Sequence, residues 1–304
     1  MFNLVTILGP TASGKTNLAV NFAARHHGEI ISADSRQVYL QLDIGSGKDL
    51  TEYRIGNQFI PYHLIDIHPV SYEYNLFEFQ QDAYRAIKAI WNRRNLPVLC
   101  GGTGMYLQSV VQNYDLRTVP ADPVYRQSLA LKSDQELIQL LQSIKQLHNK
   151  TDTEKRERLI RALEIARFQQ ENPIPDPPAI NTVVFGIHFN RQELKRRITD
   201  RLQARIDQGM IEEVEDLLKQ GTDPERLNLL GLEYKLITQY LQGQIKNYND
   251  FFQKLNASIH AFAKRQMTWF RKMEKDGIVI HWLDGNDTLP DKLKKMHTIL
   301  ESGS

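Results

Sequence analysis

The chain has 304 residues, 41% of them hydrophobic, and a formal net charge of +2 at pH 7. This length allows one large domain or a core with a smaller insertion, and the apolar content suffices for a packed interior. No run approaches the roughly 18 to 20 consecutive apolar residues of a membrane-spanning helix, and no signal-peptide pattern opens the chain. We therefore expect a soluble cytoplasmic protein without membrane association. The single cysteine, Cys100, excludes an internal disulfide and a cysteine-rich zinc module.

Basic residues gather at three places. The runs KRERLIR (155–161), KRRITDRLQAR (195–205) and KRQMTWFRK (264–272) are rich in lysine and arginine. Such runs form either the solvated face of a helix or a phosphate-binding surface, and the small net charge does not decide between these alternatives.

Short β-branched runs alternate with segments that have apolar residues at three- and four-residue spacing. We predict strands at 4–8, 29–32, 97–100, 182–188 and 278–282, and helices at 14–26, 76–94, 104–112, 191–218, 231–243 and 249–273. Continuous apolar strands separated by helices are typical of a parallel sheet covered on both faces. The sequence therefore predicts an α/β fold with a parallel sheet core flanked by helices.

The strand pattern is interrupted between Asp115 and about Pro178. This region has helical patterns and ends in ENPIPDPP (171–178), whose prolines cannot continue a helix. We predict a small helical insertion domain over 116–177, set into a catalytic core formed by 1–115 and 178–304.

A phosphate-binding loop follows the first predicted strand. GPTASGKT (9–16) matches the pattern G-x-x-x-x-G-K-[ST] and opens a predicted helix. The glycines let backbone N–H groups of 12–16 point inward, and the helix N-terminus adds partial positive charge, so we expect this P-loop to bind a polyphosphate. Lys15 would neutralise phosphate oxygens, and Thr16 would offer its hydroxyl to Mg²⁺. The loop does not distinguish ATP from another diphosphate ester.

Two further loops are expected beside it, because the carboxyl ends of parallel strands meet at one edge of a sheet. The second predicted strand leads to Asp34, followed by Ser-Arg-Gln (35–37), and the third leads to GGTG (101–104) with Thr103. Asp34 could take a proton from a substrate, ligate Mg²⁺ or cap the turn. Thr103 could assist the chemistry or merely complete its turn.

A second candidate for the magnesium ligand is Asp66 in the run LIDI (64–67). His63 and His68 flank it, but a metal site would need further ligands at suitable spacing. We expect both histidines to be loop or wall residues.

Eight motifs together resemble the tRNA dimethylallyltransferase (tRNA isopentenyltransferase) family. They are GPTASGKT (9–16), ISADSRQVY (31–39), DIGSGK (43–48), HLIDI (63–67), GGTGMYL (101–107), RLIRALEI (158–165), GLEYK (231–235) and AKRQMTWFR (263–271). They occur in the family's order and span nearly the whole chain.

The resemblance implies transfer of a dimethylallyl group from dimethylallyl diphosphate to the N6 amine of the adenosine 3′-adjacent to the anticodon in tRNA. The diphosphate leaving group would be bound, directly or through Mg²⁺, by Gly9, Pro10, Thr11, Ala12, Ser13, Gly14, Lys15 and Thr16, together with Arg201. Asp34 would be the general base and Thr103 would assist at the same amine. The resemblance thus favours the base among the possible roles of Asp34.

It also implies contacts to tRNA. At the extruded base these are Asp34, Ser35, Arg36, Gln37 and Thr103, and elsewhere on the tRNA they are Arg126, Glu157, Arg158, Leu159, Ile160 and Arg161, together with 231–235. Lys264, Arg265 and Arg271 would form a phosphate-facing stripe, whereas Trp269 and Phe270 are more typical of a core. We expect a monomer.

Three other kinds of protein share some of these motifs. An adenylate isopentenyltransferase would use a free nucleotide, a small P-loop kinase would use ATP, and a non-catalytic RNA-binding protein would keep only the fold. The insertion and the basic C-terminal helices favour the tRNA enzyme over the first of these.

Overall fold

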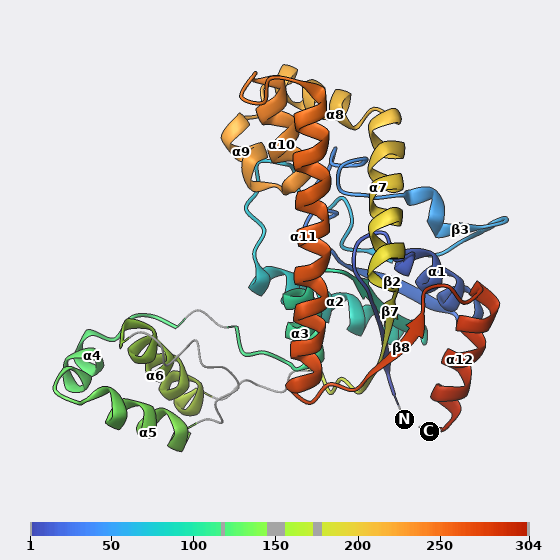
Figure 1. Ribbon diagram of the computed structural model, residues 1–304. Coiled ribbons are helices and arrows are strands. Elements are labelled where there is room, and N and C mark those ends of the chain that lie inside the picture. Colours follow the sequence, from blue (N-terminus) through green and yellow to red (C-terminus); the bar gives the residue numbers. More distant parts are fainter. Residues whose placement is uncertain (1, 117–118, 145–155, 173–177, 303–304) are drawn as a thin grey trace. The chain divides into compact units, whose positions relative to one another are not determined.

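The computed structural model describes residues 2–116, 119–144, 156–172 and 178–302 (Figure 1). The chain divides into two compact units, one of Met1–Gln112 with Ile180–Ser304 and one of Asn113–Ala179. The insertion that we predicted at 116–177 falls within the second unit. The proline-rich linker predicted at 171–178 lies mostly outside the described residues.

A parallel sheet forms the centre of the larger unit. Its strands are β1 (Leu4–Leu8), β2 (Gly28–Ala33), β5 (Tyr62–His63), β6 (Leu96–Gly101), β7 (Thr182–His188) and β8 (Ile280–Asp284), in the order β5-β2-β6-β1-β7-β8. All neighbouring pairs are parallel. The five predicted strands are confirmed with small shifts at their ends. The sequence pattern missed β5, which is too short for a periodic signal, and the hairpin of β3 (Arg54–Ile55) and β4 (Gln58–Phe59).

Helices cover both faces of the sheet because alternate strand residues point to opposite sides. Val5 and Ile7 pack into one apolar cluster with α1 (Lys15–Arg25) and α12 (Leu289–Ser302). Leu4 and Leu8 pack into the other, with α2 (Leu76–Asn92), α3 (Gly104–Val111) and α11 (Tyr248–Lys275). Burial on both faces explains why the strands read as continuous apolar runs, and it confirms the predicted α/β fold.

A helical layer adjoins the sheet. It consists of α7 (Arg191–Asp207), α8 (Met210–Lys219), α9 (Pro224–Leu229) and α10 (Leu232–Leu241), which pack with α11 around residues such as Leu202, Val214 and Phe251. In Figure 1, α7 and α11 run beside each other. Asn190 and Asn247 cap α7 and α11 by accepting hydrogen bonds from the third backbone N–H of each helix.

The prediction of one helix over 191–218 is wrong at one point. The chain breaks between α7 and α8 at Gln208 and Gly209, where Gly209 has φ 99°. Glycine adopts this left-handed conformation without the steric penalty of a side chain, and it ends the first helix. The break lets α8 turn back beside α10.

The smaller unit is helical, as predicted. It contains α4 (Pro123–Ala130), α5 (Asp134–Ile144) and α6 (Arg156–Glu171), with Leu129, Leu137, Leu141, Leu159 and Leu163 in its core. Asp122 caps α4 by accepting a hydrogen bond from the backbone N–H of Tyr125. None of the helices within the described ranges has the length and apolarity to cross a bilayer.

Candidate active site

A cavity of about 860 Å³ lies at the carboxyl edge of the sheet in the larger unit. The register pairs Leu8 with Gly101 and Ala33 with Gly101, so β1, β2 and β6 end at one level. Their three following loops therefore meet, and all three line the cavity. Residues of α7, α9, α10 and α11 and of the segment 45–53 supply further walls.

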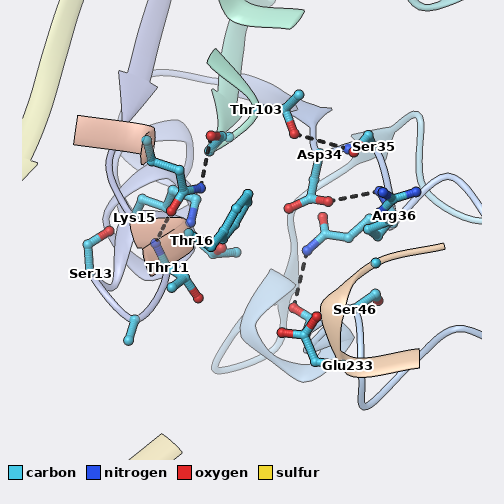
Figure 2. A pocket seen from close by; sticks show the side chains of 18 of the residues that line it. Thr11, Ser13, Lys15, Thr16, Asp34, Ser35, Arg36, Ser46, Thr103 and Glu233 are labelled. Atoms are coloured by element: carbon cyan, nitrogen blue, oxygen red, sulfur yellow. Dashed lines mark hydrogen bonds between the residues drawn. The ribbon is translucent and has the colours of Figure 1, made fainter. Parts of the chain in front are cut away.

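The P-loop forms one wall of this cavity. Residues Thr11 to Thr16 line it, and α1 begins at Lys15 directly after Gly14 (Figure 2). Gly9 and Pro10 are buried outside the lining, where they shape the loop. A Cβ at Gly9 would come within 2.6 Å of Ser13 Oγ, which shows how tightly the loop folds on itself.

Lys15 occupies the base of the loop. Its Nζ lies 3.4 Å from the carbonyl oxygen of Pro10. Burial lowers the pKa of Lys15, and the charges of Arg201 and Arg205 act in the same direction. The thiol of Cys100 also lines the cavity, and burial raises its pKa to about 12. Cys100 is therefore a neutral residue of the wall. An anion bound on the loop would raise the pKa of Lys15 again and so favour its charged ammonium form.

Three arginines of α7 face the P-loop at four-residue spacing. Arg197 donates from Nε to Ala12 O at 2.9 Å, and Arg201 approaches Thr11 Oγ1 at 3.4 Å. Arg201 and Arg205 both lie near the carboxylate of Asp49, at 3.4 and 3.8 Å. The structure places the predicted Arg201 at the cavity, and it adds Arg197 and Arg205, which the sequence analysis missed.

Asp34 and Thr103 face the cavity from neighbouring loops. The backbone N–H of Arg36 donates to Asp34 Oδ1 at 2.9 Å, and that of Ser35 donates to Thr103 Oγ1 at 3.3 Å. In Figure 2 the second carboxylate oxygen of Asp34 points toward the space that separates it from Lys15 and Thr16. Asp34 thus caps its own turn while its second carboxylate oxygen faces the cavity, so the cap does not exclude the role of a base.

Gln37 lines the cavity but is held by its neighbours. Ser32 Oγ donates to Gln37 Oε1 at 2.8 Å, and Gln37 Nε2 donates to Gly47 O at 3.1 Å. These bonds tie the end of β2 to the loop 43–48. The same loop is fixed by Glu213, whose carboxylate accepts from the backbone N–H of Asp43 and Gly45 at 3.0 and 3.1 Å.

Asp66 is not a magnesium ligand, contrary to the alternative from the LIDI run. Its carboxylate pairs with the ammonium group of Lys48, which also bonds Asp43 Oδ1 at 2.7 Å and Tyr39 O at 3.0 Å. The side chain of Lys48 is fully buried, and Asp66 does not line the cavity. His63 lies in β5 and bonds Glu29 at 2.7 Å, so, contrary to our expectation, it is neither a loop nor a wall residue. His68 lies in a loop, as expected, and stacks on Tyr72.

Helix α11 closes the cavity with polar and aromatic residues. Gln266 accepts from the backbone N–H of Thr11 and donates to Gly102 O, both at 2.9 Å. Phe270 is buried in the core, as predicted, whereas the partly buried Trp269 also lines the cavity. Arg265 is exposed at the cavity wall, and Lys264 and Arg271 are exposed elsewhere on α11.

Two carboxylic acids of the wall have perturbed acidity. Burial raises the pKa of Glu233, in the first turn of α10. Burial and the nearby Asp49 raise the pKa of Glu52. Glu233 belongs to the GLEYK motif (231–235), which the resemblance linked to tRNA contacts, whereas Glu52 lies in none of the eight motifs.

Whether the cavity can bind Mg²⁺ depends on the oxygen ligands that its lining residues offer. Thr16 lines it beside Lys15, as the P-loop pattern predicts. Within the described residues, no group of three or more His, Cys, Asp or Glu side chains could hold a metal. Mg²⁺ commonly takes one or two protein ligands and otherwise water and substrate phosphates, so a lone threonine hydroxyl fits that ion and does not fit an all-protein metal site.

The predicted tRNA-contacting residues of the smaller unit have mixed surroundings. Arg126 makes two hydrogen bonds of 2.8 Å to Glu164, and Arg161 bonds the same carboxylate at 3.1 Å. Glu157 and Arg158 are exposed and Ile160 is half-buried. Leu159 is 1% exposed in the core of this unit, so a contact through its side chain is ruled out by burial.

A parallel sheet with a glycine-rich phosphate cradle after β1, and an acid directly after β2, defines a P-loop α/β enzyme. A family model described as IPP transferase matches residues 37–273, and one described as isopentenyl transferase matches residues 2–57. The chain belongs to the IPP transferase family.

Individual relatives agree with this assignment. The chain is 52% identical over 300 residues to tRNA dimethylallyltransferase 1 of Geotalea uraniireducens, covering 98% of this chain and 97% of the relative. It is 50% identical over 283 residues to tRNA dimethylallyltransferase 2 of Porphyromonas gingivalis, covering 92% and 93%. The crystal structure of the tRNA isopentenylpyrophosphate transferase from Bacillus halodurans superposes with a TM-score of 0.75 at 31% identity, covering 99% of this chain and 96% of that one.

Proposed function

We propose that this protein transfers a dimethylallyl group from dimethylallyl diphosphate to the N6 amine of the adenosine 3′-adjacent to the anticodon in tRNA, with release of diphosphate. The observation that carries the proposal is the shared cavity: the P-loop and the carboxylate of Asp34 line the same space. Relatives at about half identity over almost the whole chain are named for this activity.

Transfer requires activation of both partners. An adenine amine is a poor nucleophile because its lone pair is delocalised into the ring. As the bond from N6 to the allylic carbon forms, the N6 proton passes to the carboxylate of Asp34, and Thr103 holds the amine through its hydroxyl. The bond from the allylic carbon to the diphosphate oxygen breaks with its electron pair, and the leaving group carries that charge to Lys15, Arg201 and the N–H groups of the P-loop. Atoms and charge balance without a further reactant.

Mg²⁺ is the cofactor that we propose, with the Thr16 hydroxyl as its protein ligand. When bound, the ion would neutralise part of the diphosphate charge. With or without the ion, the P-loop and the α7 arginines would orient the donor. Arg197 and Arg201 contact Ala12 and Thr11 of the loop, so their positions relative to it are fixed.

Apolar side chains in the cavity favour a prenyl donor over ATP. Met105, Leu229 and Phe262 are 44%, 65% and 37% exposed, and all three line the cavity. Exposed large hydrophobic residues that gather at a binding cleft mark the position of an apolar group. A five-carbon allylic chain would cover such a surface, whereas the phosphoryl group that a small-molecule kinase transfers from ATP would not need it.

The acceptor base must leave its stack to reach Asp34, at a cost of a few kcal/mol. Ser35 and Arg36 line the cavity next to Asp34 and are the proposed base contacts, with Gln37 acting mainly to position the neighbouring loop. The proposed contacts to the rest of the tRNA are Lys264, Arg265 and Arg271 on α11, and Arg126 and residues 157–161 in the smaller unit, except for the buried side chain of Leu159. We further propose a cytoplasmic monomer.

The proposal is tested by mass spectrometry of nucleosides from tRNA incubated with the purified protein and dimethylallyl diphosphate. A prenylated adenosine next to the anticodon is the expected product. Prenylation of AMP with no reaction on tRNA would instead establish an adenylate isopentenyltransferase, and phosphate transfer from ATP to a small acceptor would establish a kinase. Absence of product on tRNA, with the P-loop intact, would contradict the proposal.

A further inference from the structure

Arg205 lies at the cavity one helical turn beyond Arg201. Its side chain is 11% exposed, and it lines the cavity together with Arg201 and Asp49. Gly47, at φ 70°, passes directly over it, and a Cβ at position 47 would overlap the guanidinium of Arg205. The backbone of the loop 43–48 therefore packs against this side chain and hides it from solvent.

The guanidinium is buried without adequate partners. Its NH2 atom has no hydrogen-bond partner among the residues that the structure describes. The nearest carboxylate, Asp49, is 3.8 Å away, is 44% exposed and also serves Arg201. Burial and the charge of Arg201 lower the pKa of Arg205 to about 10. A buried cation with an unsatisfied N–H group is costly, and here it lies at the edge of the P-loop.

A small side cavity connects Arg205 with the P-loop. It has a volume of about 20 Å³ and is lined by Thr11, Ala12, Arg201, Arg205 and Glu233, among others. Along a helix, Arg201 and Arg205 are separated by ~6 Å, with their side chains on one face. Arg201 reaches the side of the loop at Thr11, and Arg205 reaches the adjoining space.

We infer that Arg205 is a second arginine that binds the diphosphate of the prenyl donor. The inference rests on the proposed function. Arg201 and the loop hold one part of the diphosphate, and the unpaired NH2 of Arg205 donates to an oxygen of the other part. Arg205 lines the main cavity together with the P-loop, so a diphosphate held by the loop lies on the side of the guanidinium that Gly47 does not cover. Asp49 is the counter-ion that holds both arginines in place.

The test compares Arg205→Met with Arg205→Lys and with the control Lys195→Met. Lys195 is an exposed residue of the same helix outside the cavity, so its replacement removes an equal charge without touching the site. Titration calorimetry with inorganic diphosphate and Mg²⁺ measures the affinity of each variant. We expect Arg205→Met to weaken binding by about tenfold to a hundredfold, the range for a lost charged hydrogen bond. Arg205→Lys should retain part of the affinity, and Lys195→Met should match the parent.

Thermal unfolding separates this role from a structural one. In the absence of diphosphate, Arg205→Met should raise Tm or leave it unchanged, since it removes a buried charge that the 3.8 Å pairing with Asp49 offsets poorly, beside Met210 and Leu202. The increase in Tm caused by diphosphate should shrink in the same variant. A lower Tm with unchanged affinity for diphosphate would show a structural residue and overturn the inference. Weakened binding of tRNA with unchanged diphosphate binding would assign the guanidinium to RNA and overturn it equally.

These outcomes are independent of the overall reaction. If the parent protein forms no prenylated adenosine, the proposed function fails while the diphosphate titrations still decide the role of Arg205. If the parent forms product and Arg205→Met binds diphosphate as the parent does, only the role of Arg205 fails.

Discussion

The side-chain carbonyl of Gln266 accepts a hydrogen bond of 2.9 Å from the backbone N–H of Thr11, which joins α11 to the P-loop across most of the sequence. The same amide donates to Gly102 O at 2.9 Å, and the side chain is buried. One residue thus holds the phosphate cradle and the loop that carries Thr103 at a fixed separation. The two halves of the proposed reaction depend on that separation, because displacement of reacting groups by about 1 Å costs large factors in rate.

Replacement of Gln266 should therefore impair the cradle. Gln266→Met leaves Thr11 N–H and Gly102 O without this partner, and we expect about 2 kcal/mol lower stability and roughly tenfold weaker diphosphate binding. Gln266→Glu keeps an acceptor for Thr11 but adds a negative charge beside the loop, so its diphosphate binding should be weaker still. Calorimetric titration and thermal unfolding measure both effects. Parent-like affinity in Gln266→Met would show that the residue only fills space.

Lys15 should impose a pH dependence on diphosphate binding. Its ammonium form binds the anion, and burial lowers its pKa below the usual 10.5. As pH rises through this lowered value the ammonium is lost, so affinity for diphosphate should fall before pH 10.5 is reached. The variant Lys15→Arg keeps its charge over this range, so the ratio of parent to variant affinity should decline with rising pH. The ionisation of diphosphate affects both proteins equally and therefore cancels in that ratio. A ratio that stays constant with pH would contradict the binding of diphosphate by the Lys15 ammonium group. Lys15→Ala should weaken binding at every pH.

Glu164 should stabilise the smaller unit. Its side chain is 1% exposed, and the hydrogen bonds from Arg126, stronger than the opposing effect of burial, lower its pKa to about 2. Because the folded value lies below the usual 4.5, the stabilisation is complete above pH 4.5 and is lost as the pH falls toward 2. We expect Glu164→Gln to lower the stability of this unit by about 2 kcal/mol at pH 7, less than for a fully buried pair because Arg126 is half exposed. Hydrogen exchange of amides in α4 to α6 measures the effect, which should shrink in acid.

The chemistry of the loops could be predicted from the sequence because each signal is local. The P-loop spacing, the acid at Asp34 and the glycine-flanked Thr103 follow apolar strands, and the parallel register brings them together. The strands and most helices were predictable for the same reason, since each has its own periodicity.

Residues that act through tertiary contacts had no such signal. Gln266 and Arg205 lie on amphipathic helices, where a glutamine or arginine is most often solvated, and only packing against Thr11 and Gly47 reveals their environment. Asp66 shows the opposite case. It follows an apolar run, as a metal ligand at the end of a strand would, yet its carboxylate forms an ion pair with the buried Lys48. Leu159 was assigned to a tRNA-contacting stretch by position alone, and its burial could be found only once α6 was packed.

The central claim is that the carboxylate of Asp34 takes the proton of the attacking amine at a site whose diphosphate cradle works independently of it. Single-turnover transfer by Asp34→Asn tests it most directly, with saturating tRNA and dimethylallyl diphosphate and with both dissociation constants measured alongside. We expect Asp34→Asn to transfer the group more slowly by a factor of about 10² to 10⁴, with affinities for both substrates within a few-fold of the parent. A transfer rate equal to that of the parent would contradict it.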